Sequence, residues 1–147
     1  MQTNSRASLT TAAAAWTPMN GEFLIDTNAL IKLLSRDPSL RWRMGHDFRC
    51  FLSFISVGEM YAGAHQSARS DFNAGEVRRI CAEIPVLEWD IEIADRYGRI
   101  QADLRRKGKP IPQNDIWIAA TATRHSMTLI TLDRHFAHVE GLPTEFW

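Results

Sequence analysis

The chain is poor in cysteine. It has two, Cys50 and Cys81, which lie far apart in the sequence. A zinc site built on cysteine needs several thiolates or imidazoles at short spacing, and a small disulfide scaffold needs more pairs, so both classes are excluded. We expect two buried thiols and a reducing, cytoplasmic setting.

Three other features are also missing. No apolar run approaches the roughly 18 residues of a membrane-spanning helix, so we expect no membrane segment. Lys and Arg (17) balance Asp and Glu (17), so the net charge does not imply a global attraction to nucleic acid. No glycine-rich loop follows the first expected strand, which argues against a nucleotide-binding Rossmann domain.

The remaining composition is that of a folded domain. The chain has 147 residues, 45% of them hydrophobic, which suffices for one domain with a substantial core. The first 21 residues contain no acidic side chain and are rich in Ala, Ser and Thr. We therefore predict a disordered extension over residues 1–21 and a single folded domain over residues 22–147.

Expected strands alternate with expected helices along this domain. The strands are predicted at 22–25, 50–55, 84–89, 127–131 and, as a short edge strand, 143–147. The helices are predicted after residue 28 and at 39–44, 60 onward, 71–83, 91–107 and 116–120. This alternation predicts an α/β fold in which helices flank both faces of a central parallel sheet of four to five strands. Pro85 indicates either that its strand lies at an edge or that Pro85 is the first residue of that strand. Phe72 and Val77 are expected on the buried side of their helix.

Carboxylates stand where these elements meet. Asp26, Glu59 and Asp133 each follow an expected strand, and Asp115 begins an apolar helix. In a parallel sheet the carboxyl ends of the strands share one edge, so the four side chains are expected together. They would repel one another unless a cation or protons were bound. Oxygen ligands without His or Cys favour Mg²⁺, with Mn²⁺ possible, and such a site suits phosphodiester hydrolysis.

Each residue also has a simpler interpretation. Asp26 or Asn28 is a good helix cap, and Ser56 with Glu59 matches a capping box. His65, beyond Glu59 on the same helix, is interpreted as structural. A basic cluster near the end of the 91–107 helix is explained by the helix dipole or by contacts with an RNA backbone. It consists of Arg105, Arg106, Lys107 and Lys109.

Four segments, in this order, resemble the PIN-domain family and, within it, the VapC-type toxins of bacterial type II toxin–antitoxin systems. They are Leu24–Asn28, Ser56–Glu59 with Tyr61–Gly63, Arg106–Ile111 with Asn114–Ala120, and Thr131–Asp133 with Phe136. Each segment alone is a weak signal, but the four at these separations are specific. The resemblance covers about residues 22 to 147.

The resemblance implies a PIN-like three-layer sandwich and a Mg²⁺-dependent endoribonuclease. It implies catalytic and metal-binding roles for Asp26, Glu59, Asp115 and Asp133, with support from Thr27, Asn28, Asn114 and Thr131. It also implies an RNA substrate, a cognate antitoxin and a homodimer.

Two alternatives remain open. One is a catalytically silent PIN-like module that binds RNA or protein. The other is a phosphotransfer domain of the receiver or haloacid-dehalogenase type; the latter expects a second Asp at position 28, where this chain has Asn28.

Overall fold

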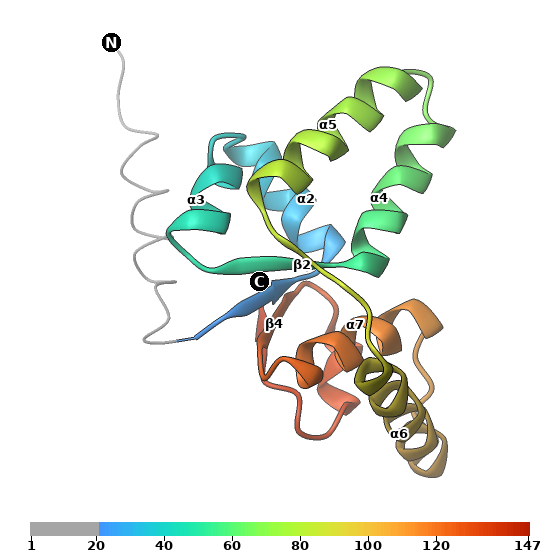
Figure 1. Ribbon diagram of the computed structural model, residues 1–147. Helices are drawn as coiled ribbons and strands as arrows, with labels where there is room; N and C mark the ends of the chain where they lie inside the picture. The colour runs from blue at the N-terminus through green and yellow to red at the C-terminus, as the bar shows by residue number, and fades with distance from the viewer. Residues whose placement is uncertain (1–20) are drawn as a thin grey trace.

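The computed structural model describes residues 21–147 (Figure 1). Most of the extension predicted to be disordered, residues 1–21, lies outside the described residues. The elements are β1 (Phe23–Ile25), α2 (Thr27–Arg36), α3 (Leu40–His46), β2 (Cys50–Ser53), α4 (Phe54–Gln66), α5 (Ser70–Glu83), β3 (Val86–Leu87), α6 (Ile91–Lys107), α7 (Gln113–Arg124), β4 (Thr128–Thr131), the 3₁₀ helix η1 (Arg134–His138) and β5 (Thr144–Phe146).

The five strands form one sheet in the order β3-β2-β1-β4-β5, and every pair is parallel. The predicted parallel sheet and its expected edge strands are confirmed. Pro85 precedes the edge strand β3, where its missing N–H costs no central ladder bond.

The sheet has a separate hydrophobic core on each face, because successive side chains of a strand point to opposite sides. Phe23 and Ile25 pack with α2, α3, α4 and α5. Leu24 and Leu129 pack with α6, α7 and η1. Figure 1 shows these two helical layers above and below the strands. The chain is therefore the three-layer α/β sandwich that the resemblance implied.

Several predicted boundaries were wrong. The strand expected over 50–55 ends at Ser53, and α4 begins at Phe54. The strand expected over 84–89 pairs only at Val86–Leu87. Phe72, expected on the buried side of α5, is 52% exposed, whereas Val77 is buried as expected, together with Ala74. In each case tertiary packing overrides the local pattern.

The two ends of α6 follow the sequence closely. Asp90 caps its first turn by accepting a hydrogen bond from the Ile93 N–H, and Gly108 ends it with φ of 64°. Glycine suits this left-handed position because it has no Cβ. Among residues 21–147, no helix is both long and apolar enough to cross a membrane.

Candidate active site

The strand order changes direction between β1 and β4. From β1 the chain adds β2 and β3 on one side, and then places β4 and β5 on the other. In open α/β sheets, ligands bind beyond the carboxyl ends of the strands at such a reversal. Asp26 directly follows β1, and Asp133 stands two residues after the end of β4, so the fold brings both to this point.

Asp26 is fixed by two hydrogen bonds. Its Oδ1 accepts from the Thr27 N–H at 2.8 Å, and its Oδ2 accepts from the Thr131 hydroxyl at 3.0 Å. The Thr131 oxygen in turn accepts from the Asp133 N–H at 3.1 Å. The side chain of Asp26 is thus the N-cap of α2, as the simpler interpretation held, and it also lies in the carboxylate cluster.

Glu59 does not take part in the predicted capping box, so that interpretation of Ser56 and Glu59 was wrong. The cap of α4 is Ser53, whose Oγ accepts from the Ser56 N–H at 2.9 Å. This shift frees Glu59, which lies in the second turn of α4. Its Oε1 is buried and has no hydrogen-bond partner among the described residues.

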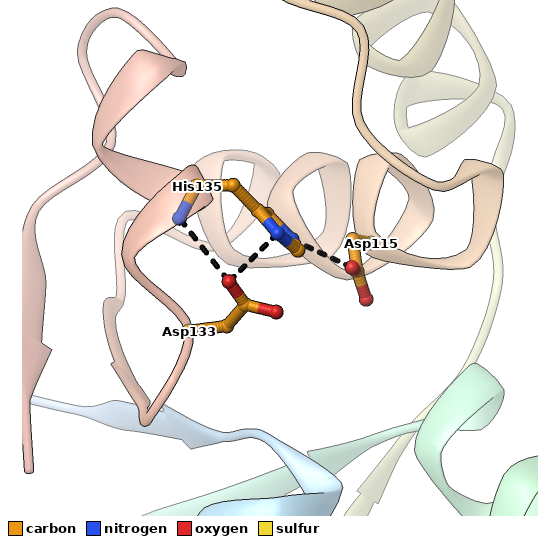
Figure 2. A group of neighbouring side chains, drawn as sticks. All are labelled: Asp115, Asp133 and His135. Carbon is orange, nitrogen blue, oxygen red and sulfur yellow. Dashed lines mark hydrogen bonds and ion pairs between the residues drawn. The ribbon is translucent and has the colours of Figure 1, made fainter.

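Asp115 and Asp133 are joined by a histidine that the sequence interpretation missed. The Nε2 of His135 lies 2.7 Å from Asp115 Oδ2, and its Nδ1 lies 2.7 Å from Asp133 Oδ1. Figure 2 shows the imidazole between the two carboxylates. Only its position two residues after Asp133 hinted at this role, and that spacing gave no sign of the contact with Asp115 on α7.

One pocket of about 470 Å³ collects the acidic side chains. Its lining consists of Asp26, Thr27, Asn28, Glu59, Pro112, Gln113, Asn114, Asp115 and Asp133. All four predicted carboxylates are therefore together, with three of the four predicted supporting residues. The fourth, Thr131, is buried beneath and touches the pocket through Asp26.

Burial and mutual repulsion set the electrostatics of the pocket. Burial raises the pKa of Asp26; the Thr131 bond opposes this, and the charges of Asp115 and Asp133 add to it. The pKa of Glu59 is raised by burial and then by Asp26 and Asp115. Burial also raises the pKa of Asp115, although the His135 hydrogen bond lowers it.

The pocket fits a hard divalent cation. The buried Glu59 Oε1 and the buried Thr27 hydroxyl both lack a hydrogen-bond partner among residues 21–147. Orphaned buried oxygens are costly, and a cation would relieve both their desolvation and the carboxylate repulsion. The charged groups of the lining are all carboxylates, and oxygen ligands of this kind favour Mg²⁺ or Mn²⁺.

The bridge from His135 yields a prediction about metal affinity. His135→Ala should weaken Mn²⁺ binding by roughly 10- to 100-fold, because outer-shell hydrogen bonds hold ligating carboxylates in place. Isothermal titration calorimetry on the full chain measures this. His135→Gln, which restores one hydrogen bond, should recover part of the loss. His65→Ala is the matched control, and equal affinity of His135→Ala and wild type would remove the positioning role.

The other sequence candidates are not among the residues that line the pocket. His65 is exposed on α4, with its Nδ1 3.3 Å from Ser70 Oγ and its ring stacked on Tyr61. In the basic cluster, Arg106 and Lys107 pair with Asp103 at 3.0 and 2.7 Å. Arg105 and Lys109 are exposed, and neither has an ion pair with any described residue. The RNA contact proposed for this cluster stays a prediction.

The fold and pocket together define a class of protein. The PIN domain profile matches residues 23–142, most of the chain. The chain belongs to the PIN-domain family, as its motifs indicated. This family membership, together with the strand order above, excludes the alternative of a phosphotransfer domain of the receiver or haloacid-dehalogenase type.

Within the family the similarity is to VapC proteins. The chain is 32% identical over 130 residues to ribonuclease VapC2 of Haemophilus influenzae, covering 86% of this chain and 98% of that protein. It is 30% identical, with the same coverage, to a tRNA(fMet)-specific endonuclease VapC of Shigella flexneri.

Solved structures agree with this placement. The crystal structure of DNA-bound VapBC from Salmonella typhimurium superposes with a TM-score of 0.78 at 29% identity, covering 87% of this chain and 99% of that one. VapBC-1 from nontypeable Haemophilus influenzae gives a TM-score of 0.75 at 27% identity, with coverage of 85% and 97%.

Proposed function

We propose that this protein is a Mg²⁺-dependent endoribonuclease and the toxin of a type II toxin–antitoxin pair. The observation that carries the proposal is the gathering of Asp26, Glu59, Asp115 and Asp133 around one pocket at the sheet reversal. The VapC relatives named as ribonucleases support it.

The pocket's residues divide the work of hydrolysis. Asp26, Glu59 and Asp115 would hold the cation, and Asp133 flanks them. When bound, the ion activates water and neutralises charge on the scissile phosphate. Thr131 fixes the orientation of Asp26 through its 3.0 Å hydrogen bond, and His135 fixes Asp115 and Asp133. Asn28 and Asn114 line the pocket and offer amide groups to a phosphate or to water.

Electrostatics explain why metal and substrate belong together in this pocket. The lining residues carry no Lys or Arg, so an RNA phosphate alone would meet only negative charge. A divalent cation held by these carboxylates would offset part of their charge and would give a phosphate oxygen a positive centre to contact. The basic cluster at the end of α6 would hold the backbone outside the pocket, and binding there would weaken with salt.

Two partners follow from the same proposal. The VapBC family to which the similar solved structures belong is a family of toxin–antitoxin systems. We propose that this chain likewise binds an antitoxin that covers the pocket. A homodimer remains part of the proposal.

Incubation of total cellular RNA with the protein tests the function. With Mg²⁺ we expect a few discrete products that carry a 5′-phosphate and a 3′-hydroxyl, because water attacks phosphorus and the 3′-oxygen leaves. EDTA should remove them, and Mn²⁺ should restore them. Products with 2′,3′-cyclic ends that persist in EDTA would indicate a contaminating nuclease. No cleavage by the folded protein with either metal would favour the alternative, a silent binding module.

A further inference from the structure

A nitrogen ligand stands at the edge of the oxygen-rich pocket. The polar side chains of the lining are carboxylates, amides and a hydroxyl. His135 is not part of that lining, yet its ring reaches two carboxylates that are. Its Nε2 lies 2.7 Å from Asp115 Oδ2, and its Nδ1 lies 2.7 Å from Asp133 Oδ1 (Figure 2). We call Asp115, Asp133 and His135 the histidine cluster.

The backbone holds the three side chains of this cluster in place. Asp115 lies in the first turn of α7, and Asp133 is the N-cap of η1, where its Oδ1 accepts from the His135 N–H at 3.2 Å. The ring of His135 rests against that of Phe136, with centroids 4.9 Å apart. One ligand atom from each member of the cluster lies within 4.8 Å of the other two. The cluster is therefore close to the arrangement that a bound ion requires.

The two contacts of His135 cannot both be hydrogen bonds of a neutral ring. A neutral imidazole has one N–H and one lone pair. One nitrogen donates to a carboxylate, whereas the other turns its lone pair toward a carboxylate oxygen at the same distance of 2.7 Å. Lone pairs this close repel each other, and a positive charge between them removes the repulsion. A metal ion or a proton supplies that charge.

The imidazole changes which cations the cluster favours. Mg²⁺ selects oxygen ligands, demands octahedral geometry and keeps several waters. Zn²⁺ and its neighbours in the transition series bind imidazole nitrogen well, and Zn²⁺ accepts four ligands at about 2.0–2.2 Å. Such ligands stand about 3.4 Å apart, so each 2.7 Å contact has to open by less than about 1 Å. Two carboxylates, one imidazole and one water make a set of this kind.

A buried hydroxyl also indicates that the pocket takes a ligand. Thr27 is only 8% exposed, and its side-chain oxygen has no hydrogen-bond partner among residues 21–147. It lines the same pocket as Asp115 and Asp133. A hydroxyl buried in this way is costly unless a ligand, such as a metal-bound water, reaches it.

We propose that the histidine cluster binds Zn²⁺ and related transition-metal cations as a site distinct from the all-oxygen site of Asp26, Glu59 and Asp115. The two sites share Asp115, so an ion held by His135 and Asp133 competes with Mg²⁺ for that carboxylate. Zn²⁺ is therefore an inhibitor of the Mg²⁺-dependent reaction. Binding to the cluster is independent of the proposed function, whereas inhibition rests on it.

Co²⁺ is the probe for the nitrogen ligand, in full-length protein without an affinity tag. Its visible absorption is strong in a four-coordinate site and weak when six oxygen ligands surround it. Wild type should give the strong band, Zn²⁺ should remove it, and a large excess of Mg²⁺ should leave it. His135→Gln should lose the band and lower Zn²⁺ affinity by at least about 100-fold in calorimetry, the upper end of the cost of losing an outer-shell partner. Its Mn²⁺ affinity should fall by less than about tenfold.

Two variants serve as controls. His65→Gln makes the same substitution at an exposed histidine on α4, stacked on Tyr61, and should keep the band. Glu59→Gln removes a ligand of the all-oxygen site alone, so it should keep the band and lose Mg²⁺ affinity. Circular dichroism establishes that each variant is folded.

Two results would overturn the cation site. One is a wild-type spectrum of six-coordinate Co²⁺, or a strong band that survives in His135→Gln. The other is a loss of Zn²⁺ and Mn²⁺ affinity by the same factor in His135→Gln, since this leaves the imidazole only the task of positioning the carboxylates. Cleavage supported by Zn²⁺ alone would overturn the competition between the two sites.

The two proposals fail separately. A Co²⁺ band that depends on His135, in a protein that cleaves no RNA with Mg²⁺, would refute the nuclease and keep the cation site. Mg²⁺-dependent cleavage by a protein without this band would do the opposite. If both hold, Zn²⁺ should inhibit Mg²⁺-supported cleavage by wild type, and His135→Gln should need a Zn²⁺ concentration higher by the factor that separates their affinities.

Discussion

Asp26→Asn should lower RNA cleavage by at least about 10³-fold and leave the protein folded. Metal-assisted charge stabilisation contributes several kcal/mol to such reactions, and each 1.36 kcal/mol is a factor of about ten. The substituted side chain would keep an oxygen for the Thr27 N–H and gain an amide that can donate to the Thr131 hydroxyl. Single-turnover cleavage of the RNA identified above, with circular dichroism of both proteins, measures the two effects.

Asp95→Asn is the control for this substitution. Asp95 lies on the exposed face of α6, paired with Arg99 at 2.7 Å, so its loss should leave cleavage unchanged. Full cleavage by folded Asp26→Asn would refute the metal role of Asp26. Equal losses in both variants would point to a general electrostatic effect of removing negative charge.

Saturating Mg²⁺ or Mn²⁺ should raise the melting temperature at pH 7 by roughly 5–10 °C. A ligand at 100 times its Kd stabilises the folded state by about 2.7 kcal/mol, and each kcal/mol shifts Tm by about 2–4 °C for a chain of this size. Differential scanning calorimetry with metal and with EDTA measures the shift. Asp26→Asn should lose most of it.

In the metal-free protein, the stability contributed by three carboxyl groups of the pocket should fall as pH rises, whereas ordinary paired carboxylates lose theirs as pH falls. The pKa values of Asp26, Glu59 and Asp115 are raised above 3.8, 4.5 and 3.8 in the folded state, so the folded state binds protons more tightly than the unfolded state. Their stabilising contribution is complete below the ordinary values and is lost as pH rises through the folded ones.

In EDTA, the Tm of the wild type minus that of Asp26→Asn should therefore fall as pH rises from about 4.5 to 7. Added Mg²⁺ should restore the wild type near neutrality and have little effect at the acidic end, where protons compete for the same oxygens. A Tm difference that is flat over this range would show that the carboxylates do not repel one another as their burial and spacing imply.

Local sequence determined the elements and their order. Apolar segments that alternate with helical ones predicted the strands of the buried sheet and the helices on its two faces. Short-range rules placed the Asp90 cap and the Gly108 terminus of α6. The four motifs marked the chain positions of Asp26, Glu59, Asp115 and Asp133. Asp26, Asp115 and Asp133 stand close to a strand exit or a helix start, whereas Glu59, expected directly after a strand, lies in the second turn of α4.

Local rules misplaced features that depend on neighbours distant in sequence. Ser53 and Ser56 are equally good caps, and only the end of β2 pairing decides that α4 begins at Phe54 and leaves Glu59 free. Phe72 fits the apolar stripe of α5, yet Ala74 and Val77 face the core and Phe72 faces solvent.

Tertiary structure alone decided how the site is joined together. The hydrogen bond between Thr131 and Asp26 links residues that are distant in the sequence, and it exists because β4 pairs beside β1. His135 bridges Asp115 and Asp133 because η1 folds back against the start of α7. Ring contacts likewise unite α4, α6, α7 and the segment before α6, through Phe54, Trp89, Tyr97 and Trp117. Sequence patterns report the conformation of neighbouring residues, whereas these contacts follow from how the helices pack on the sheet.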